Sequence, residues 1–187
     1  MGFTSAELET FRGVTVPDLV ADDCMLLFVG INPGLWTAAT QTHFCHPSNR
    51  FYPALRLAGL IPWSVDTDKG MTDEQRESLT ARGIGITNLV RRATARASEL
   101  GREELIDGGE RLSLLVGELR PRVVAVAGVT AYRDAFGERG ASPGKQGSDL
   151  GPAELWVVPN PSGLNAHETV ESLAEAYAEP ARAAGIL

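Results

Sequence analysis

Two short segments place an asparagine before a proline with a glycine close behind, a pattern that suits chemistry as well as a turn. They are Asn32-Pro33-Gly34 and Asn160-Pro161-Ser162-Gly163-Leu164. An asparagine amide accepts and donates hydrogen bonds but is no base near neutral pH. It can hold a water without removing its proton, which suits a reaction at a cation-like carbon, such as cleavage of an N-glycosidic bond. The alternative is an ordinary turn built from favoured turn residues.

Other residues in these two segments have a chemical and a plain interpretation. Pro33 would fix the turn, and Gly34 would let main-chain N–H groups approach an anionic leaving base. Phe44 could stack on a flat base or could pack under its loop. Leu164 could fill the hole left by an extruded nucleotide while Gly163 lets the backbone approach, or Leu164 could staple the next helix.

The elements that must position these residues follow from the apolar pattern. Nearly continuous apolar runs predict strands, and 3.6-residue periodicity with capping signals predicts helices between them. The expected strands are Met25–Ile31, Ile84–Val90, Val123–Ala127 and Leu155–Pro159. The expected helices are Asn49–Ala58 with Asn49 as cap, Thr72–Ala81 with a capping box, Arg102–Leu119 with a break allowed at Gly108-Gly109, Thr130–Phe136 and His167–Ala184.

This alternation predicts an α/β fold, a three-layer α/β/α sandwich with a short, mainly parallel central sheet. Ligands of such sheets bind beyond the carboxyl ends of the strands. Both asparagine-proline segments follow strand ends, so we expect them to face one cleft. Between Asn32 and the helix at residue 49 the sequence predicts loop.

Length and composition point to one domain over residues 1–187. The chain is 43% hydrophobic, lacks an apolar run of membrane-spanning length and does not begin like a signal peptide, so we expect a cytoplasmic protein and no membrane partner. Cys24 and Cys45 have no metal-binding spacing, and we expect two free thiols. The three histidines are too separated for a metal set, and none is assigned a chemical role.

The net charge of −7 argues against a protein that coats nucleic acid nonspecifically, yet it allows a local basic face. Arg91, Arg92 and Arg96 follow one another with no acid between them. They could contact phosphates. The plain alternative is a solvated loop.

Five segments, in this order, resemble those of the mismatch-specific uracil-DNA glycosylases, a family that includes the thymine-DNA glycosylases. They are "GINPGL", "FCHPSNRFY", "GITNLVRRAT", "GERGASPGKQ" and "VVPNPSGL". The resemblance runs from about residue 25 to 182 and implies a uracil-DNA glycosylase-like fold. It implies removal of uracil, opposite guanine above all, from double-stranded DNA, with no cofactor and no metal, by what we expect to be a monomer.

The resemblance also implies roles for single residues. Asn32 matches the catalytic asparagine that positions the water attacking C1′. Gly163, Leu164 and Asn165 match the wedge that enters the duplex beside the widowed guanine. The implied base pocket comprises Ile31, Pro33, Gly34, Thr37, Phe44, Asn88 and Asn160, and the implied DNA contacts add Ser162, Arg91 and Arg92.

Three residues depart from the family pattern. Trp36 stands where a small polar residue is common and could cover the pocket mouth. Ala166 stands where some members have an arginine in the wedge, which predicts a weaker hold on the orphan guanine. Asn88 matches the thymine-directed branch, and its amide could face the pocket.

The absence of a carboxylate beside Asn32 predicts slow turnover and tolerance for several pyrimidine lesions. Such an enzyme should work best on wobble pairs, where extruding the base from the duplex costs little free energy. Neither asparagine-proline motif contains a lysine, so a Schiff-base lyase step has no evident nucleophile. Two other functions remain open. One is a lesion-binding module without catalysis, and the other is a hydrolase of free nucleosides, for which the "SGLNA" wedge would have no purpose.

Overall fold

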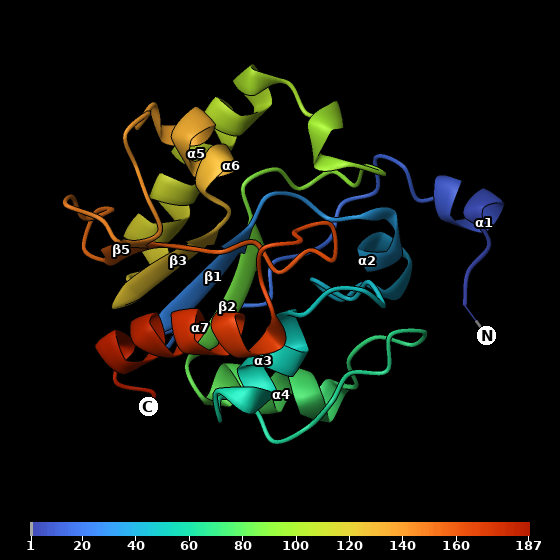
Figure 1. Ribbon diagram of the computed structural model, residues 1–187, viewed down its shortest axis with the longest axis horizontal. Coiled ribbons are helices and arrows are strands. Elements are labelled where there is room, and N and C mark those ends of the chain that lie inside the picture. The colour runs from blue at the N-terminus through green and yellow to red at the C-terminus, as the bar shows by residue number, and fades with distance from the viewer. Residues whose placement is uncertain (1) are drawn as a thin grey trace.

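The fold is built on a five-stranded sheet with the strand order β2-β1-β3-β5-β4, seen in a computed structural model that describes residues 2–187 (Figure 1). The strands are β1 (Leu26–Gly30), β2 (Ile84–Asn88), β3 (Val123–Ala127), β4 (Gly144–Lys145) and β5 (Glu154–Val158). The helices are α1 (Ser5–Glu9), α2 (Leu35–Thr40), α3 (Phe51–Leu57), α4 (Asp73–Ala81), α5 (Arg102–Leu119), α6 (Val129–Phe136) and α7 (Val170–Ala184), with a 3-10 turn at Ala97–Glu99.

Four strands run parallel, and only the short edge strand β4 is antiparallel. β1 lies between β2 and β3, and every residue of these three strands is buried. The continuous apolar runs are explained by this double-sided burial. The four predicted strands are confirmed, each within two residues of its expected ends.

Helices cover both faces of the sheet. Leu26 and Phe28 of β1 pack with Phe51 of α3 and Tyr177 of α7, while Leu27 and the other alternate residues face α5 and α6. Figure 1 shows α3, α4 and α7 below the sheet and α5 and α6 above it. The predicted three-layer α/β/α sandwich is confirmed.

The long helix α5 runs unbroken through Gly108-Gly109, where the sequence allowed a break. A Cβ on Gly108 would lie 2.6 Å from the Leu89 carbonyl oxygen, and one on Gly109 would lie 2.9 Å from that of Ala135. The two glycines therefore let α5 approach neighbouring backbone, and the packing offsets their low helix propensity.

The expected loop between Asn32 and residue 49 is partly wrong, because α2 forms there. Gly34 occupies its N-cap position, and Leu35 and Ala38 are buried against Val16 and Ala93. A helix of six residues with a small apolar face shows too little hydrophobic periodicity to be predicted from the sequence.

Helix starts differ from expectation in two places. α3 begins at Phe51 after Arg50, although the Asn49 side chain does accept a hydrogen bond from the Phe51 N–H at 2.9 Å. α7 begins at Val170, where Thr169 forms the cap, rather than at His167. The capping box of α4 between Thr72 and Gln75 is confirmed. Within residues 2–187, no helix has both the length and the apolar character that crossing a bilayer requires.

Candidate active site at the carboxyl edge of the sheet

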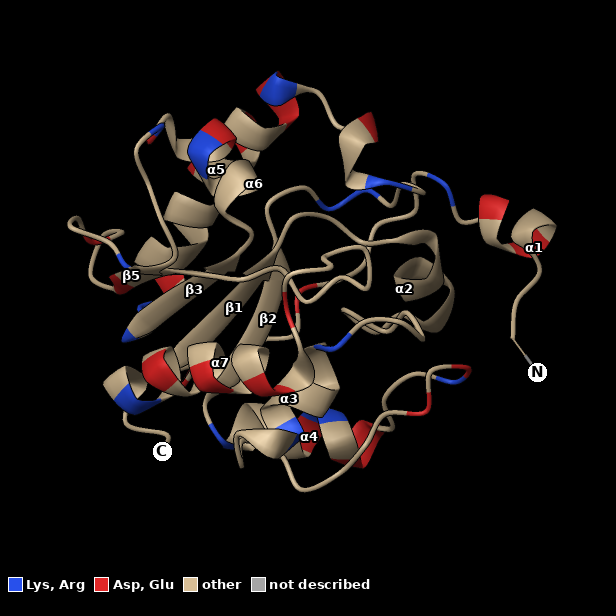
Figure 2. Cartoon of the chain, in the orientation of Figure 1, with Lys and Arg blue, Asp and Glu red and all other residues tan. Residues whose placement is uncertain are grey.

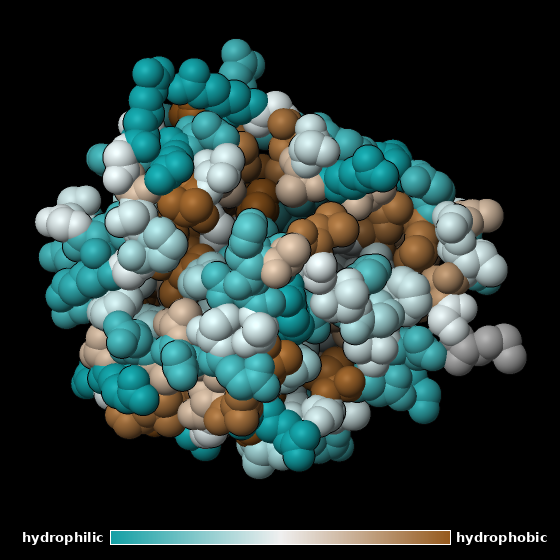
Figure 3. Space-filling view, viewed as in Figure 1, coloured by the Kyte–Doolittle hydropathy of each residue, from teal (hydrophilic) through white to brown (hydrophobic). Residues whose placement is uncertain are grey.

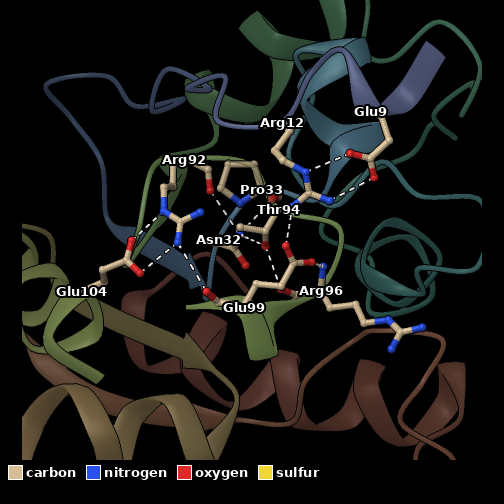
Figure 4. Close-up of polar contacts among 9 residues, drawn as sticks. All are labelled: Glu9, Arg12, Asn32, Pro33, Arg92, Thr94, Arg96, Glu99 and Glu104. Atoms are coloured by element: carbon tan, nitrogen blue, oxygen red, sulfur yellow. Dashed lines mark hydrogen bonds and ion pairs between the residues drawn. The ribbon is translucent and has the colours of Figure 1, made fainter. Parts of the chain in front are cut away.

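Asn32 lies just beyond the carboxyl end of β1, where three acceptors surround its NH2 group (Figure 4). Its Nδ2 donates to the carbonyl oxygens of Pro33 at 3.0 Å and Arg92 at 3.1 Å, and to Thr94 Oγ1 at 2.8 Å. The Thr94 hydroxyl donates its hydrogen bond to the Arg96 carbonyl oxygen at 2.8 Å, so toward Asn32 it can only accept.

The orientation of the Asn32 amide is thereby determined. All three neighbours of its nitrogen are acceptors, so a flipped amide would set oxygen against oxygen. Its Oδ1 accepts no hydrogen bond from any residue in the range 2–187 and lies on the far side of the amide. The side chain therefore presents a fixed, free acceptor, which is the group needed to hold a water.

The segment that supplies two of these acceptors is held by ion pairs. Arg92 donates to both carboxylate oxygens of Glu104 in α5, at 2.6 and 2.9 Å. These hydrogen bonds, with one from the Gly101 N–H, lower the pKa of Glu104 to about 2. Arg12 bridges Glu99 and Glu9 in the same view of Figure 4.

The ion pair with Glu104 distinguishes Arg92 from Arg91 and Arg96, the other arginines of the predicted basic face. The guanidinium of Arg92 is occupied by Glu104, and its carbonyl oxygen holds Asn32. Arg91 and Arg96 are exposed, and within the described chain neither side chain forms an ion pair. The phosphate role expected of Arg92 is therefore less suited to its surroundings than the same role for Arg91.

Phe44 and Asn88 meet over Gly30, the last residue of β1. A Cβ on Gly30 would collide with Asn88 Oδ1 and would lie 3.0 Å from Phe44 Cζ. Phe44 adopts a left-handed backbone with φ 57° and stacks on Phe51, with ring centroids 4.2 Å apart and 26° between planes. A non-glycine residue in this conformation is strained, and such strain is concentrated at functional sites.

Asn88 is tied to a buried histidine that the sequence did not single out. Its Nδ2 lies 2.9 Å from His43 Nδ1, and His43 Nε2 lies 2.8 Å from the Pro17 carbonyl oxygen. Burial lowers the pKa of His43. Neither contact leaves a local pattern, because the paired residues are 45 and 26 positions apart.

The second asparagine-proline segment follows β5 and lies at the same edge. The Asn160 side chain accepts from the Ser162 N–H at 3.0 Å, and Asn165 Nδ2 donates to the Asn160 carbonyl oxygen at 3.0 Å. Asn160 Nδ2 and the Ile31 side chain both lie within about 4 Å of a Cβ position on Gly128. The predicted meeting of the two segments at one sheet edge is thus confirmed at Ile31 and Asn160.

Leu164 is 90% exposed at the tip of this segment. The alternative in which it staples the following helix is therefore wrong. Arg50 secures the loop beneath it: its N–H donates to the Pro161 carbonyl oxygen, and its guanidinium donates to those of Ser162 at 2.5 Å, Asn165 at 2.7 Å and Glu168. An exposed apolar tip on a fixed loop has the shape of a wedge.

Trp36 and Thr37 lie in α2, the helix that follows the first asparagine-proline segment. Trp36 donates from Nε1 to the Thr67 carbonyl oxygen at 2.6 Å and sets its ring against Phe3 and His46. It therefore secures the N-terminal segment and the loop at residue 67. Thr37 is buried in α2, and its hydroxyl forms no hydrogen bond with the described residues.

A cavity of about 680 Å³ lies nearby, and Asn32 is not among its lining residues. Phe44, His46, Asn49 and Tyr52 are among its lining residues, together with residues of the loop at 64–67 and the start of α7. It lies on the α3 side of the Phe44 ring. We place the reacting centre at Asn32 because the oriented amide is there, and we assign the cavity no role.

Charge is unevenly distributed over the molecule. Figure 2 shows acidic residues along α7, where Glu171, Glu175 and Glu179 form one exposed stripe, and basic residues in the segment between β2 and α5. Apolar side chains form separate patches in Figure 3 rather than one face. Cys24 and Cys45 are buried free thiols, and residues 2–187 hold no cluster of three or more His, Cys, Asp or Glu residues that could bind a metal.

Comparison with known proteins agrees with this geometry. Residues 17–180 match the family model described as the uracil DNA glycosylase superfamily. A solution NMR structure of a proposed uracil DNA glycosylase from Methanosarcina acetivorans superposes with a TM-score of 0.61 at 21% identity, over 92% of this chain and 98% of that one. The expected uracil-DNA glycosylase-like fold is confirmed, and the chain belongs to the uracil DNA glycosylase superfamily.

Proposed function

We propose that this DNA glycosylase extrudes uracil from double-stranded DNA, preferentially opposite guanine, and hydrolyses its N-glycosidic bond with a water held by Asn32. Thymine and related damaged pyrimidines are further candidate substrates. The observation that carries the proposal is the oriented Asn32 amide, whose nitrogen faces three acceptors while its oxygen accepts no hydrogen bond from the described residues.

The Asn32 oxygen would accept a hydrogen bond from the water and direct the water's oxygen toward C1′. As the C1′–N1 bond breaks, its electron pair leaves with the base, the water oxygen bonds to C1′, and a water proton passes to the departing base or to solvent. Asn32 takes no proton, so positioning and electrostatics carry the catalysis. The products are an abasic site and the free base.

The residues around Asn32 divide the remaining tasks. Phe44 stacks on the extruded base, and Ile31 and Asn88 complete its pocket. Leu164 fills the space that the base leaves in the duplex, while Gly163 and Asn165 contact the widowed guanine. Since no carboxylate is hydrogen-bonded to Asn32, turnover is slow and gains most where a wobble pair makes extrusion cheap.

The test uses duplex oligonucleotides that carry G·U, G·T or A·U, and single-stranded uracil, with alkaline cleavage of abasic sites as the readout. We expect cutting of G·U above the other substrates by the wild type and loss of cutting by Asn32→Ala of equal thermal stability. Cutting that persists in Asn32→Ala would remove the catalytic assignment. Binding of G·U without any cutting would instead identify a lesion-binding module.

The reaction should stop at the abasic site, in a monomeric enzyme of the cytoplasm. A lyase step needs an amine nucleophile, and the two lysines, Lys69 and Lys145, lie outside both asparagine-proline segments. Borohydride should therefore trap no protein–DNA adduct, and a trapped adduct would contradict a monofunctional enzyme.

A further inference from the structure

Residues 12–16, the N-terminal strap, lie against the segment that orients Asn32. The contact is made at Ala93, which uses both of its backbone groups on the strap. Its N–H donates to the Val14 carbonyl oxygen at 2.9 Å, and its carbonyl oxygen accepts from the Gly13 N–H at 2.9 Å. The strap is therefore paired with the backbone at the centre of this segment.

The residues before and after Ala93 form their hydrogen bonds on the other side. The Arg92 carbonyl oxygen and the Thr94 hydroxyl accept from Asn32 Nδ2, and the Thr94 N–H donates to the Pro33 carbonyl oxygen at 3.1 Å. This alternation is that of an extended strand, whose successive backbone groups point to opposite sides. The strap thus holds from one side the two acceptors that Asn32 meets on the other.

A small apolar cluster attaches the strap to the rest of the protein. Val16 and Ala93 are buried against α2, and Leu8 and Phe11 pack on them. This cluster is separate from the two larger ones that cover the faces of the sheet. A segment with so few buried contacts opens locally more easily than the sheet does. A change in the strap can therefore reach the site without unfolding the protein.

Arg12 connects the strap to Thr94 by a second route (Figure 4). Its guanidinium donates to one carboxylate oxygen of Glu99, and the other oxygen accepts from the Arg96 N–H at 2.8 Å. The Arg96 carbonyl oxygen in turn accepts from the Thr94 hydroxyl at 2.8 Å. A continuous chain of hydrogen bonds therefore runs from Arg12 to a residue that holds Asn32.

We infer that the N-terminal strap is a positioning element of the active site, which keeps the Asn32 amide oriented through Ala93 and Thr94. When the strap detaches, the two acceptors lose their fixed places and the amide can turn. The chemical step then slows while the binding of DNA stays the same, because only the orientation of the catalytic group has changed. This inference rests on the proposed function and assigns control of its rate to residues that form no hydrogen bond with Asn32.

Two glycines with the same backbone geometry provide a variant and its matched control. Gly13 has φ 78° and no atom within 4 Å of its Cβ position, so Gly13→Ala strains the strap without a steric clash. Gly59, at the end of α3, has φ 77° and an equally open Cβ position. Gly59→Ala therefore imposes the same backbone strain away from the strap.

The first measurement needs no substrate. The 15N–1H signals of the Asn32 side-chain NH2 group, assigned with Asn32→Ala, report its hydrogen bonds. We expect Gly13→Ala to shift or broaden these signals and Gly59→Ala to leave them in place. Unmoved signals in Gly13→Ala, or the same change in both variants, would overturn the inference even if the wild type excises uracil. If the wild type excises nothing, the proposed function fails, and the signals still decide whether the strap orients the amide.

The second measurement separates the chemical step from binding. In Gly13→Ala we expect the single-turnover rate on G·U at saturating enzyme to fall about 5- to 10-fold, with the affinity for the duplex unchanged. Gly59→Ala should keep both values. An unchanged rate in Gly13→Ala would contradict the inference. So would a lower affinity with the saturating rate intact, because the strap would then act by contacting DNA.

Arg12 gives a second variant whose folding is not at risk, since its side chain is 44% exposed. We expect the saturating rate to fall about 2- to 5-fold in Arg12→Ala and to be partly restored in Arg12→Lys. Salt screens exposed ion pairs, so the wild-type rate at saturation should decline as salt rises, whereas that of Arg12→Ala should not. Arg82→Ala removes an exposed arginine at the end of α4 and should behave like the wild type. An unchanged rate in Arg12→Ala, or the wild-type dependence on salt, would overturn the role of Arg12.

Discussion

At the scale of single residues, the site depends on amides whose orientation is determined by neighbours that are far away in sequence. Asn32 and Asn88 are each held through nitrogen, by Thr94 and His43 among others, and each leaves an oxygen without a partner in the described chain. Preorganised groups of this kind need no rearrangement when substrate arrives. The chemistry of Asn32 therefore depends on acceptors that never touch the substrate.

Thr94 is the residue whose change tests this dependence. Thr94→Val keeps the shape of a side chain that is 1% exposed but removes the acceptor facing Asn32 Nδ2. The loss of one hydrogen bond is worth about 1 kcal/mol, so we expect the single-turnover rate on G·U to fall about 5- to 10-fold. Thr94→Ser retains the hydroxyl and should stay near the wild-type rate.

Thermal unfolding of both Thr94 variants provides the control. A rate that is unchanged in a folded Thr94→Val protein would mean that the carbonyl oxygens of Pro33 and Arg92 suffice to orient Asn32. A loss of rate in Thr94→Ser as large as in Thr94→Val would point to packing instead of the hydrogen bond.

At the scale of elements, the wedge is a loop made rigid by contacts from a distant segment. The Arg50 guanidinium donates hydrogen bonds to three carbonyl oxygens of the loop after β5, and Gly163 lies against Ser48. The exposed Leu164 then projects from a fixed base. An apolar tip that is already in position loses little conformational freedom when it enters DNA.

Gly163→Ala should disturb this loop for a steric reason. The new Cβ would lie 2.6 Å from Ser48 Cβ and 2.8 Å from the Ser48 carbonyl oxygen, distances that require the loop to shift. We expect the single-turnover rate on G·U to fall at least about 10-fold, because small displacements of positioning groups reduce rates strongly. Phe44 and Asn32 lie outside the loop and keep their places.

Gly117→Ala is the matched control, since Gly117 lies in α5 with open space around its Cβ position. It should gain roughly 0.5–1 kcal/mol in the free energy of unfolding and keep full activity. Full activity of Gly163→Ala as well would show that Ser48 moves aside and that the fixed loop is not needed.

Elements with a strong local signal could be predicted from the sequence, and contacts between distant segments could not. The buried runs of β1 and β3 and the Thr72 capping box carry their own patterns. Asn32 and Leu164 were found through local turn chemistry and family resemblance. Thr94, His43 and Arg50 were missed because their partners lie 26 to 118 residues away, and tertiary pairs of that kind leave no period or spacing.

At the scale of the whole molecule, the net charge of −7 restricts how DNA can approach. The acidic stripe on α7 repels phosphates, whereas the segment between β2 and α5 is basic (Figure 2). In that segment Arg91 and Arg96 are exposed and form no ion pair with residues 2–187. Arg92 is already neutralised by Glu104. Adjacent arginines should therefore contribute to function in different ways.

Arg91→Ala and Arg92→Ala, each combined with Asn32→Ala to prevent cutting, test this difference through the salt dependence of binding to a G·U duplex. Each phosphate contact contributes about 0.9 to the slope of log K against log salt. Arg91→Ala should lower the slope by about that amount. Arg92→Ala should leave it nearly unchanged.

In proteins that retain Asn32, Arg92→Ala should slow excision more than Arg91→Ala does, which reverses the order of their effects on the salt dependence of binding. Arg92→Ala frees the segment whose carbonyl oxygen orients the Asn32 amide, so single-turnover excision should slow even at saturating enzyme. Arg91→Ala should be rescued at saturation, because it weakens only the grip on phosphate. Equal slopes and equal saturating rates for the two variants would mean that the Arg92–Glu104 pair opens when DNA binds, and that both arginines face phosphates.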